Sequence, residues 1–553
     1  MSQGEGSLDA IVIGSGPGGS AAADVLTQAG WSVVIMEKGS NYLLDADNLA
    51  EPASHYSNDE IKFISRHFLG PDPLIEPRTF RACIEDGDHS FVGEVNSIPA
   101  TLGGGGTHAD GKVPRFREED FRLFTELGPQ AGADVADWPL TYDDLEPYYM
   151  EVERRVGVAG TAGANPFASW RSEPYPMPSG APMYGALLSS AAAERHGLHP
   201  YPAPTAANSV VYAGRPACNN CGYCAFFGCP IHAKGDPIAL LQRIVATGRA
   251  QIMTDTFVSR IIVKNGRATG VEFIDEFGES HTMQARHVIL AAGAVETPRL
   301  LLLSGIDNPL VGRYLMVHFQ TLVVGSFKER FHAYKGRSVT HVHDDAIIGD
   351  ALSRSSAREA GLAWMRGGMV EHSGSGLAIM EAKSYPWGSR HATAMRESAL
   401  RDKLWAFIMQ GEDLAYKSNT IDLDPRVRDM HGLPVARMTY KAGKHELVAS
   451  EYFGPRLEAV LKDMGAEWTF SATSPGAQFA HGRLGAVPES RHVMGTTRMG
   501  NDPTTSVVDS YGRVHGVENL VVADSSVFVT SAGYGPTLTL VALAARAASA
   551  LAH

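Results

Sequence analysis

The chain has 553 residues, of which 44% are hydrophobic and 20% charged, and this is the composition of an ordinary globular protein with more than one hydrophobic core. Its net charge of −13 argues against nucleic acids and anionic membranes as partners, because both need a clustered basic surface. The start MSQGEGSLDA has no signal-peptide pattern, and no apolar run of about 18 residues occurs. We therefore expect a cytoplasmic protein without a membrane span.

The stretch LDAIVIGSGPGGSAAADVLTQAGWSVVIMEKG predicts a buried strand, a tight glycine turn, a helix and a second strand. Gly14, Gly16 and Gly19 have the spacing of a dinucleotide-binding turn, in which a pyrophosphate faces the start of the helix. Glu37 ends the second strand, where its carboxylate can accept hydrogen bonds from a ribose and would repel a 2′-phosphate. We therefore predict an FAD or NAD site that also includes Lys38; the alternative is a glycine turn without a ligand.

Four later stretches resemble the glucose-methanol-choline (GMC) family of FAD-dependent oxidoreductases, and the resemblance extends over nearly the whole chain. They are TLGGGGTHADGKVPRF (101–116), DWPLTYDDLEPYY (137–149), VILAAGAVETPRLLLLSG (288–305) and the segment from HVMGTTRMG to ALAARAA (492–548). The resemblance implies FAD rather than NAD. It also implies an α/β fold with a Rossmann-type FAD-binding domain and an inserted α+β substrate domain, as in p-hydroxybenzoate-hydroxylase-like architectures.

The resemblance divides the chain into three parts. Residues 1–319 are expected to form the first part of the FAD-binding domain, with an inserted lid and a cysteine-rich loop at 218–230. Residues 320–480 are the expected substrate-binding domain, because segments such as QTLVVGSF and PVARMTY alternate as strands of a separate sheet do. Residues 481–553 complete the FAD-binding domain. ATGVEF and HVILAAGAVETP are expected to be strands that return to the nucleotide domain.

Glycines 103–106 remove side chains from a loop, which allows backbone to pack flat against a planar ring. In family members with a covalently bound flavin, a histidine of this loop carries the bond, and the resemblance places His108 there. Either His108 bonds the ring or it merely lines the pocket. The cofactor-binding residues that the resemblance implies beyond the first turn are Gly106, Thr107, His108, Val258, Asp524, Ser525, Gly535, Pro536 and Thr537.

Oxidation of an alcohol requires a base near the hydride acceptor, and histidine has a suitable pKa. His492 falls at the family's catalytic histidine. Much of the family has His or Asn where this chain has Gly535, so Tyr534 or His481 is a candidate to hold the substrate hydroxyl, unless the site works with one histidine. Simple packing is the alternative for both, and His318 is expected to be structural, satisfying a backbone group.

A helix is predicted directly after Pro536, because proline is well tolerated in a first helical turn. By resemblance, this helix points its amino terminus at the flavin. Its partial positive charge would then stabilise negative charge on the reduced ring.

Cys218, Cys221, Cys224 and Cys229, followed by Pro230, have the spacing C-x2-C-x2-C-x4-C-P, one residue longer than a ferredoxin cluster motif. Similar loops occur in bacterial GMC dehydrogenases, some of which hold an Fe–S cluster that passes electrons to a partner. The alternatives are structural thiols, a four-cysteine zinc site and a thiol redox pair.

The sequence as a whole predicts FAD-dependent oxidation of a primary or secondary alcohol, with a sugar, polyol or glycoside as the favoured substrate. An aromatic or lipophilic alcohol is the alternative substrate, and a lyase that keeps FAD without redox chemistry is the alternative class. Oxygen or a protein or quinone would accept the electrons, and a homo-oligomer is compatible with the sequence.

Overall fold

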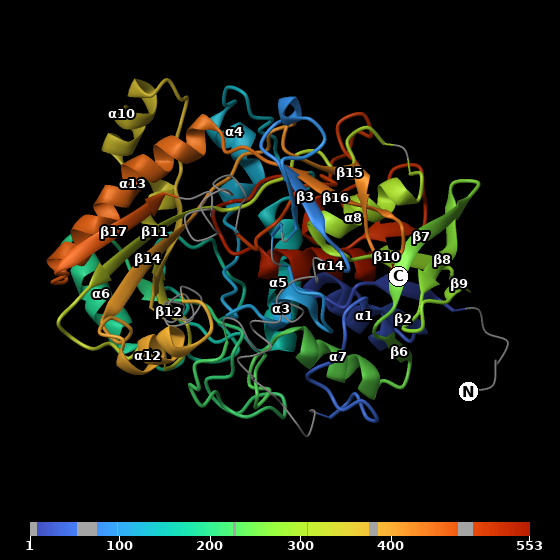
Figure 1. The fold of residues 1–553 in the computed structure, drawn as a ribbon, viewed down its shortest axis with the longest axis horizontal. Helices are drawn as coiled ribbons and strands as arrows, with labels where there is room; N and C mark the ends of the chain where they lie inside the picture. The colour runs from blue at the N-terminus through green and yellow to red at the C-terminus, as the bar shows by residue number, and fades with distance from the viewer. Residues whose placement is uncertain are drawn as a thin grey trace.

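The computed structural model describes residues 8–552 apart from 52–73, 94, 97, 225–227, 307, 334, 375–384 and 474–489. Two regions lie side by side, one built on a parallel sheet near both chain ends and one on a large antiparallel sheet (Figure 1). His481 lies outside the described residues.

The first region contains a five-stranded sheet whose neighbouring strands are all parallel. The four strands other than β6 are almost entirely buried, as their continuous apolar sequences predict. The α/β, Rossmann-type prediction is therefore confirmed. The strand order is β18 (Leu520–Val522), β10 (His287–Leu290), β1 (Ala10–Ile13), β2 (Val33–Met36) and β6 (Ala250–Met253).

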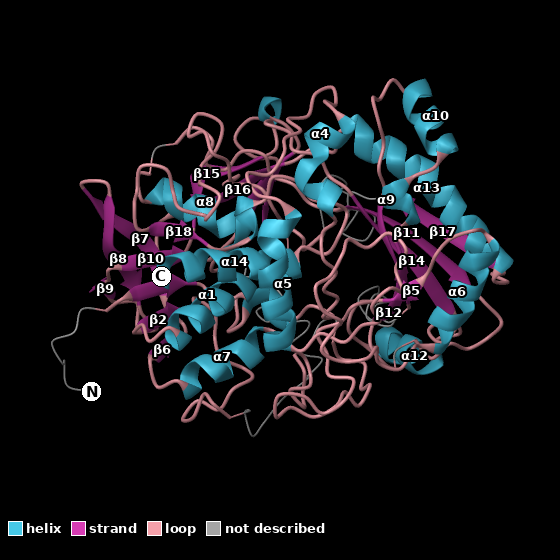
Figure 2. Cartoon of the chain, turned by 180° about the vertical axis from the view of Figure 1, so that it is seen from behind, coloured by secondary structure: helices cyan, strands magenta, loops and turns pink. Residues whose placement is uncertain are grey.

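Helices α1 (Pro17–Gln28), α14 (Thr537–Ala552), α5 (Tyr142–Val156) and α7 (Pro237–Ala246) group together beside this sheet (Figure 2). Helix α14 packs along α1, and the Tyr149 hydroxyl of α5 lies 2.7 Å from the Thr539 hydroxyl of α14. The last helix of the chain is thereby held against the first one, which places its amino terminus beside the glycine turn. Helix α8 (Gly293–Leu303) follows β10.

A separate three-stranded antiparallel sheet consists of β7 (Phe257–Lys264), β8 (Arg267–Ile274) and β9 (Ser280–Gln284). The segment ATGVEF lies in β8, which is outside the parallel sheet but contacts β10, and HVIL forms β10 within that sheet. The assignment of both segments to the nucleotide domain stays a prediction. Both segments are apolar and extended, so their sequences alone do not show that they form strands of two different sheets.

The second region contains a six-stranded sheet whose described pairings are antiparallel. Helices α13 (Lys444–Asp463) and α6 (Tyr184–Arg195) pack on it, and Trp405, Phe407 and Val323 lie in the core between them. The strand order is β17 (Trp468–Thr473), β11 (Phe319–Ser326), β14 (Leu404–Gly411), β13 (Gly368–Ser373), β12 (Val339–His343) and β5 (Tyr201–Pro202).

A four-stranded sheet joins distant parts of the chain in the order β15 (Thr420–Arg428), β16 (Pro434–Thr439), β3 (Arg78–Arg81) and β4 (Phe91–Gly93). PVARMTY thus lies in a different sheet from QTLVVGSF, and the predicted domain limits remain predictions. No helix in the described segments is long and apolar enough to cross a membrane. The shorter elements are η1 (Ile84–Asp86), α3 (Gly104–Thr107), η2 (Glu118–Arg122), α4 (Leu123–Leu127), α9 (Asp345–Ile348), α10 (Ala351–Glu359), α12 (Ser389–Glu397) and η3 (Ser525–Val527).

Gly19 of α1 provides a test of how closely the first helix must approach the sheet. A Cβ atom there would lie 2.0 Å from the Gly14 carbonyl oxygen, so Gly19→Ala should lower the free energy of unfolding by about 1–3 kcal/mol. Urea denaturation of the cofactor-free protein measures this change. Gly16→Ala is the matched control, because its Cβ would meet no protein atom within 4 Å. Equal stability of the two variants would contradict the packing argument.

Candidate active site

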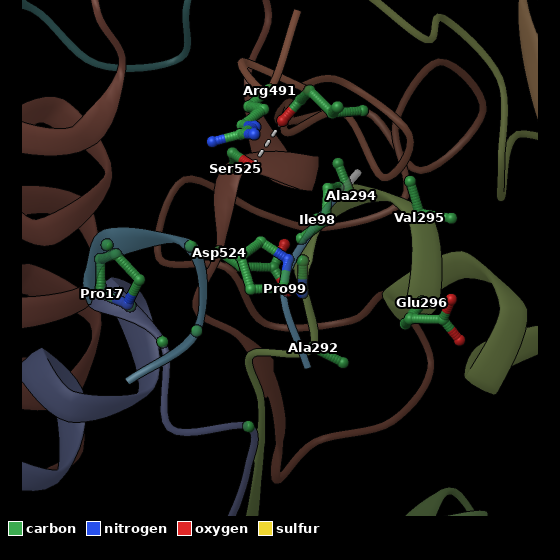
Figure 3. Close-up of a pocket in the computed structure, with 18 of the residues that line it drawn as sticks. Pro17, Ile98, Pro99, Ala292, Ala294, Val295, Glu296, Arg491, Asp524 and Ser525 are labelled. Carbon is green, nitrogen blue, oxygen red and sulfur yellow. Dashed lines mark hydrogen bonds between the residues drawn. The ribbon is translucent and has the colours of Figure 1, made fainter. Parts of the chain in front are cut away.

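A cavity of about 510 Å³ lies between the carboxyl ends of the parallel strands and the six-stranded sheet. Gly14, Glu37, Ala291 and Asp524 follow the ends of β1, β2, β10 and β18 closely, and all four line it. Pro17 and the stretch Ala292 to Glu296 lie on opposite sides of this space, with Asp524 between them (Figure 3). Ligands of open α/β sheets bind at this edge.

A buried hydrogen-bond chain fixes the nucleotide end of the cavity. The Ser15 hydroxyl donates to Glu37 Oε2 at 2.6 Å and accepts from the Gly103 N–H at 2.8 Å. The Ser15 and Gly39 N–H groups also donate to the Glu37 carboxylate, at 3.0 and 2.8 Å. Burial raises the pKa of Glu37, and these donors oppose that effect. Glu37 therefore holds three segments together in addition to lining the cavity.

The two glycine-rich loops face each other across this end. A Cβ on Gly104 would lie 3.2 Å from the Gly16 Cα, and one on Gly106 would lie 2.6 Å from the Pro17 Cγ. A Cβ on Gly16 would meet no protein atom within 4 Å, so the backbone is open to the cavity there. This cradle at the amino terminus of α1 fits the pyrophosphate of an extended dinucleotide.

Lys38 belongs to a charged cluster on the cavity wall. Its Nζ lies 2.7 Å from Glu76 Oε1, while Arg78 and Arg299 lie 3.0 and 3.1 Å from the Glu296 carboxylate. Burial opposes the charge of Glu296, but Lys38, Arg299 and Arg78 hold its pKa well below the usual range. These carboxylates are already paired, so Lys38 acts within a network rather than as an isolated cation.

The residues predicted at the flavin lie on the middle of the wall. Pro536 and Thr537 line the cavity where α14 begins, so the amino terminus of that helix faces it as predicted. The Asp524 carboxylate accepts from the Gly293 N–H at 2.9 Å and from the Thr297 hydroxyl at 2.5 Å. Burial raises the pKa of Asp524, and these hydrogen bonds oppose that effect. They also hold the carboxyl group in place on a residue that lines the cavity.

His492 lies on the cavity wall beside a second histidine that the sequence did not assign to catalysis. His492 Nδ1 lies 2.8 Å from His318 Nδ1, and His318 Nε2 lies 3.1 Å from the Ser531 carbonyl oxygen. Burial lowers the pKa of His318 to about 4 and that of His492 well below its usual range, the latter with help from His318, Lys112 and Arg491. Both rings are therefore neutral at neutral pH.

The acceptor at Ser531 determines which nitrogen of each ring carries the proton. A carbonyl can only accept, so His318 Nε2 carries a hydrogen and its Nδ1 is the acceptor for His492 Nδ1–H. His492 Nε2 then keeps its lone pair, and no described residue is hydrogen-bonded to it. His318 satisfies a backbone group, as predicted, and it also orients the candidate base.

Several predicted residues lie elsewhere. Tyr534 does not line the cavity, because its buried hydroxyl donates to Asp344 at 2.9 Å. The structure therefore does not bring Tyr534 to a substrate held there. Gly535 is next to His492, and a Cβ there would lie 4.0 Å from His492 Cε1. Gly19, Thr107 and Gly535 are not on the cavity wall. The other predicted cofactor residues line it: Gly14, Gly16, Glu37, Lys38, Gly106, His108, Val258, Asp524, Ser525, Pro536 and Thr537.

The sulfurs of the cysteine loop do not have the close spacing of ligands to a single metal ion. Among the described residues, one group of three metal-ligating types has donor atoms within 4.8 Å of one another, and it is the exposed set Asp275, Glu279 and His281. Burial raises the pKa of Cys229 and that of Cys224, the latter to about 12, so both are protonated at neutral pH when no metal is bound. This spacing does not fit a single zinc ion held by the thiolates. The ligands of an Fe–S cluster bind different iron atoms and lie farther apart, so the cluster and structural thiols both stay predictions.

The polar residues on the cavity wall that the sequence analysis missed include Lys112, Gln320, Glu371 and Gln410. The last three lie in the largely buried strands FQTLVVGS, GMVEHS and LWAFIMQG. The sequence feature that could have indicated these residues is a polar side chain at an inward position of a buried strand. Burial of such a side chain costs free energy unless it has a hydrogen-bonding partner.

Comparison with known proteins identifies the relatives of this chain. Two sequence profiles described as GMC oxidoreductase match residues 193–320 and 415–544. The 2-methyl-1,2-propanediol dehydrogenase of Mycolicibacterium austroafricanum is 30% identical, and the match covers 98% of this chain and 94% of the relative. The chain belongs to the GMC oxidoreductase family. It is a flavin-dependent oxidoreductase that acts on alcohols, as the motifs predicted.

Two further matches agree with this assignment. The large subunit of fructose dehydrogenase from Gluconobacter japonicus is 28% identical, over 99% of this chain and 98% of the relative. Pyridoxine 4-oxidase from Mesorbium loti has the same fold, with a TM-score of 0.62 at 17% identity and 98% coverage of both chains. The fold that surrounds the cavity described above is therefore the fold of these flavin-dependent relatives.

The histidine pair predicts a specific defect in a His318 variant. His318→Leu removes the acceptor for His492 Nδ1–H, so His492 can take the wrong tautomer, and flavin reduction by an alcohol should slow about 10²-fold. His318→Asn restores an oxygen acceptor near the same position and should recover part of the rate. Anaerobic stopped-flow absorbance measures the rate, and flavin content serves as the control for folding. Equal rates in the Leu variant and the native enzyme would show that His318 does not position the base.

Proposed function

We propose that the enzyme oxidises a hydroxyl group of a polyhydroxylated alcohol, such as a sugar, polyol or glycoside, to a carbonyl, with FAD as the cofactor and His492 as the base. The observation that carries this proposal is the hydrogen-bonded series Ser531–His318–His492, which leaves a lone pair on Nε2 of a histidine that lines the cavity. A neutral imidazole in that state can accept the proton of a substrate hydroxyl.

Each part of the cavity has a separate task in this mechanism. FAD, when bound, supplies the two-electron acceptor for the hydride that leaves the carbon. The glycine cradle at Gly16 and Gly106 would hold the pyrophosphate, and the amino terminus of α14 at Thr537 favours negative charge in the adjoining space. His318 holds the His492 ring while Nε2 takes the hydroxyl proton.

The walls support a polar substrate over an aromatic or lipophilic one. In the apolar strand β11, Gln320 lines the cavity, whereas Leu322 and Val324 pack in a separate apolar cluster. The segment WMRGGMVEHSGSGLAIM (364–380) contains several methionines that could line an apolar cavity, but in its described part the residue on the wall is Glu371. The relatives named above for a diol and for fructose support the same class of substrate.

We propose that the electrons leave the flavin directly and that the cysteine loop is structural, since Cys224 is a buried thiol and burial raises the pKa of Cys224 and Cys229. Oxygen, a quinone or a protein would then accept them directly. Cys218→Ser should therefore leave the iron content at zero and the flavin content unchanged, as measured by elemental analysis and absorbance. Stoichiometric iron in the native enzyme would overturn this part of the proposal.

The oxidative function is tested by the flavin spectrum. A polyol such as 1,2-butanediol, added without oxygen, should bleach the visible absorbance of the bound flavin, whereas a lyase would leave the oxidised spectrum unchanged. His492→Ala should slow the bleaching about 10²- to 10⁴-fold with an unchanged flavin content.

Denaturation in acid, followed by filtration, tests whether His108 is covalently bonded to the flavin, since a covalent flavin stays with the protein.

The low pKa of His492 predicts the pH dependence of the same reaction. The base works only when neutral, so the rate of flavin reduction should stay constant from about pH 8 to about pH 6 and fall only at lower pH. Lys112 is one of the charges that lower this pKa, together with His318 and Arg491. Lys112→Met should therefore shift the acid limb to higher pH. A native profile that already falls near pH 7 would exclude this assignment of the base.

A further inference from the structure

One face of the six-stranded sheet carries a row of polar side chains at the cavity. Gln320 of β11 pairs directly with Gln410 of β14, and Glu371 of β13 pairs with Ile408, two residues before Gln410. Directly paired residues, and residues two apart, lie on the same face of a sheet. All four line the cavity that also contains His492.

These side chains form one directed hydrogen-bond chain. Gln410 Nε2 donates to Glu371 Oε1 at 2.8 Å, and Gln320 Nε2 donates to Gln410 Oε1 at 3.0 Å. Glu371 Oε1 also pairs with Lys112 Nζ, which lies 3.3 Å from Asp110 Oδ2. An ionised carboxylate can only accept, so the Gln410 amide must point its NH₂ group at Glu371, and the orientation of Gln320 follows from that.

Burial of this network costs free energy unless a polar ligand satisfies its remaining hydrogen-bonding atoms. Glu371 and Gln410 are each 3% exposed, and burial raises the pKa of Glu371. Both contacts to Glu371 use Oε1, so its Oε2 has no hydrogen-bond partner among the described residues. Gln320 Oε1 also has no partner within the described chain. An apolar ligand would leave these atoms unsatisfied, at a large cost in affinity.

We propose that Glu371, Gln410 and Gln320, with Lys112 behind Glu371, form a specificity subsite that binds the non-reacting hydroxyl groups of the substrate. This inference rests on the proposed function and extends it by assigning substrate selection to these residues. A hydroxyl group both donates and accepts, which suits the Glu371 oxygen and the Gln320 carbonyl together with the amide N–H groups. Two carboxylates, Glu371 and Asp110, face one lysine, so an anionic substrate is disfavoured.

The test compares two ring alcohols on the holoenzyme. The probes are 1,5-anhydro-D-glucitol, which has several hydroxyl groups, and tetrahydropyran-3-ol, which has one. Anaerobic flavin reduction should favour the first probe by at least about 10²-fold, because a site built to hydrogen-bond a hydroxyl rejects an analogue that lacks it. Glu371→Gln should reduce this ratio by ten- to a hundredfold. Ile408→Val, on the same wall but apolar, should change both rates in the same proportion.

Binding provides a readout that does not depend on turnover. Calorimetric titration of 1,5-anhydro-D-glucitol into oxidised holoenzyme should show at least tenfold weaker binding to Glu371→Gln than to the native enzyme. If Glu371→Gln does not retain flavin, Gln410→Leu replaces it, since Gln410 donates to the same carboxylate oxygen. An unchanged rate ratio, or unchanged binding, in a flavin-loaded variant would overturn the subsite.

Failure of the subsite differs from failure of the proposed function. If both probes reduce the flavin and Glu371→Gln slows them equally, the function stands and the subsite is wrong. If neither probe reduces the flavin but the native enzyme binds the polyol more tightly than the variant, the subsite stands and the oxidative function is wrong.

Discussion

The buried carboxylate of Glu37 is the interaction on which the cofactor half of the cavity depends. It accepts hydrogen bonds from Ser15 and Gly39, and the Ser15 hydroxyl in turn accepts from the Gly103 N–H. The turn after β1, the end of β2 and the second glycine loop are thereby held in one arrangement. A buried acceptor of this kind is stable only while its donors are in place, so the three segments must form together.

Buried carboxylates are paired differently at the two ends of the cavity. At the nucleotide end, Glu76 and Glu296 are paired with lysine and arginine, and the wall is electrically balanced. At the sheet end, Glu371 and Asp110 share Lys112, and a chain of amides continues from Glu371. The first arrangement stabilises a wall, whereas the second leaves acceptors facing the cavity. Between them, His492 and His318 are kept neutral by burial, so this part of the site can take up a proton.

The departure at Gly535 has a structural counterpart. A glycine there leaves space beside the His492 ring, where the family resemblance predicts His or Asn, while His318 is hydrogen-bonded to the ring. Tyr534, the sequence neighbour, turns instead to Asp344, whose carboxylate also accepts from Tyr201 and Asn165. The hydrogen-bonding capacity of Tyr534 therefore supports the junction between the two regions and is not available to the substrate.

Features that depend on local chemistry could be predicted from the chain alone. The motif around His492 predicts a base, and that role stays a prediction. The glycine spacing, the buried apolar strands and Pro536 were sufficient to predict the parallel sheet, the glycine turn and the helix that faces the cavity. These succeeded because turns, caps and strand burial are encoded within a few residues.

The contacts that join distant segments follow from the folded structure and not from local sequence. The fold puts PVARMTY in a different sheet from QTLVVGSF, pairs His318 with His492 across 174 residues, and places Gln320, Glu371 and Gln410 on one face. A strand's sequence specifies which residues alternate, but not which strand lies beside it. The direction of Tyr534 and the polar wall formed by Gln320, Glu371 and Gln410 therefore depended on long-range packing.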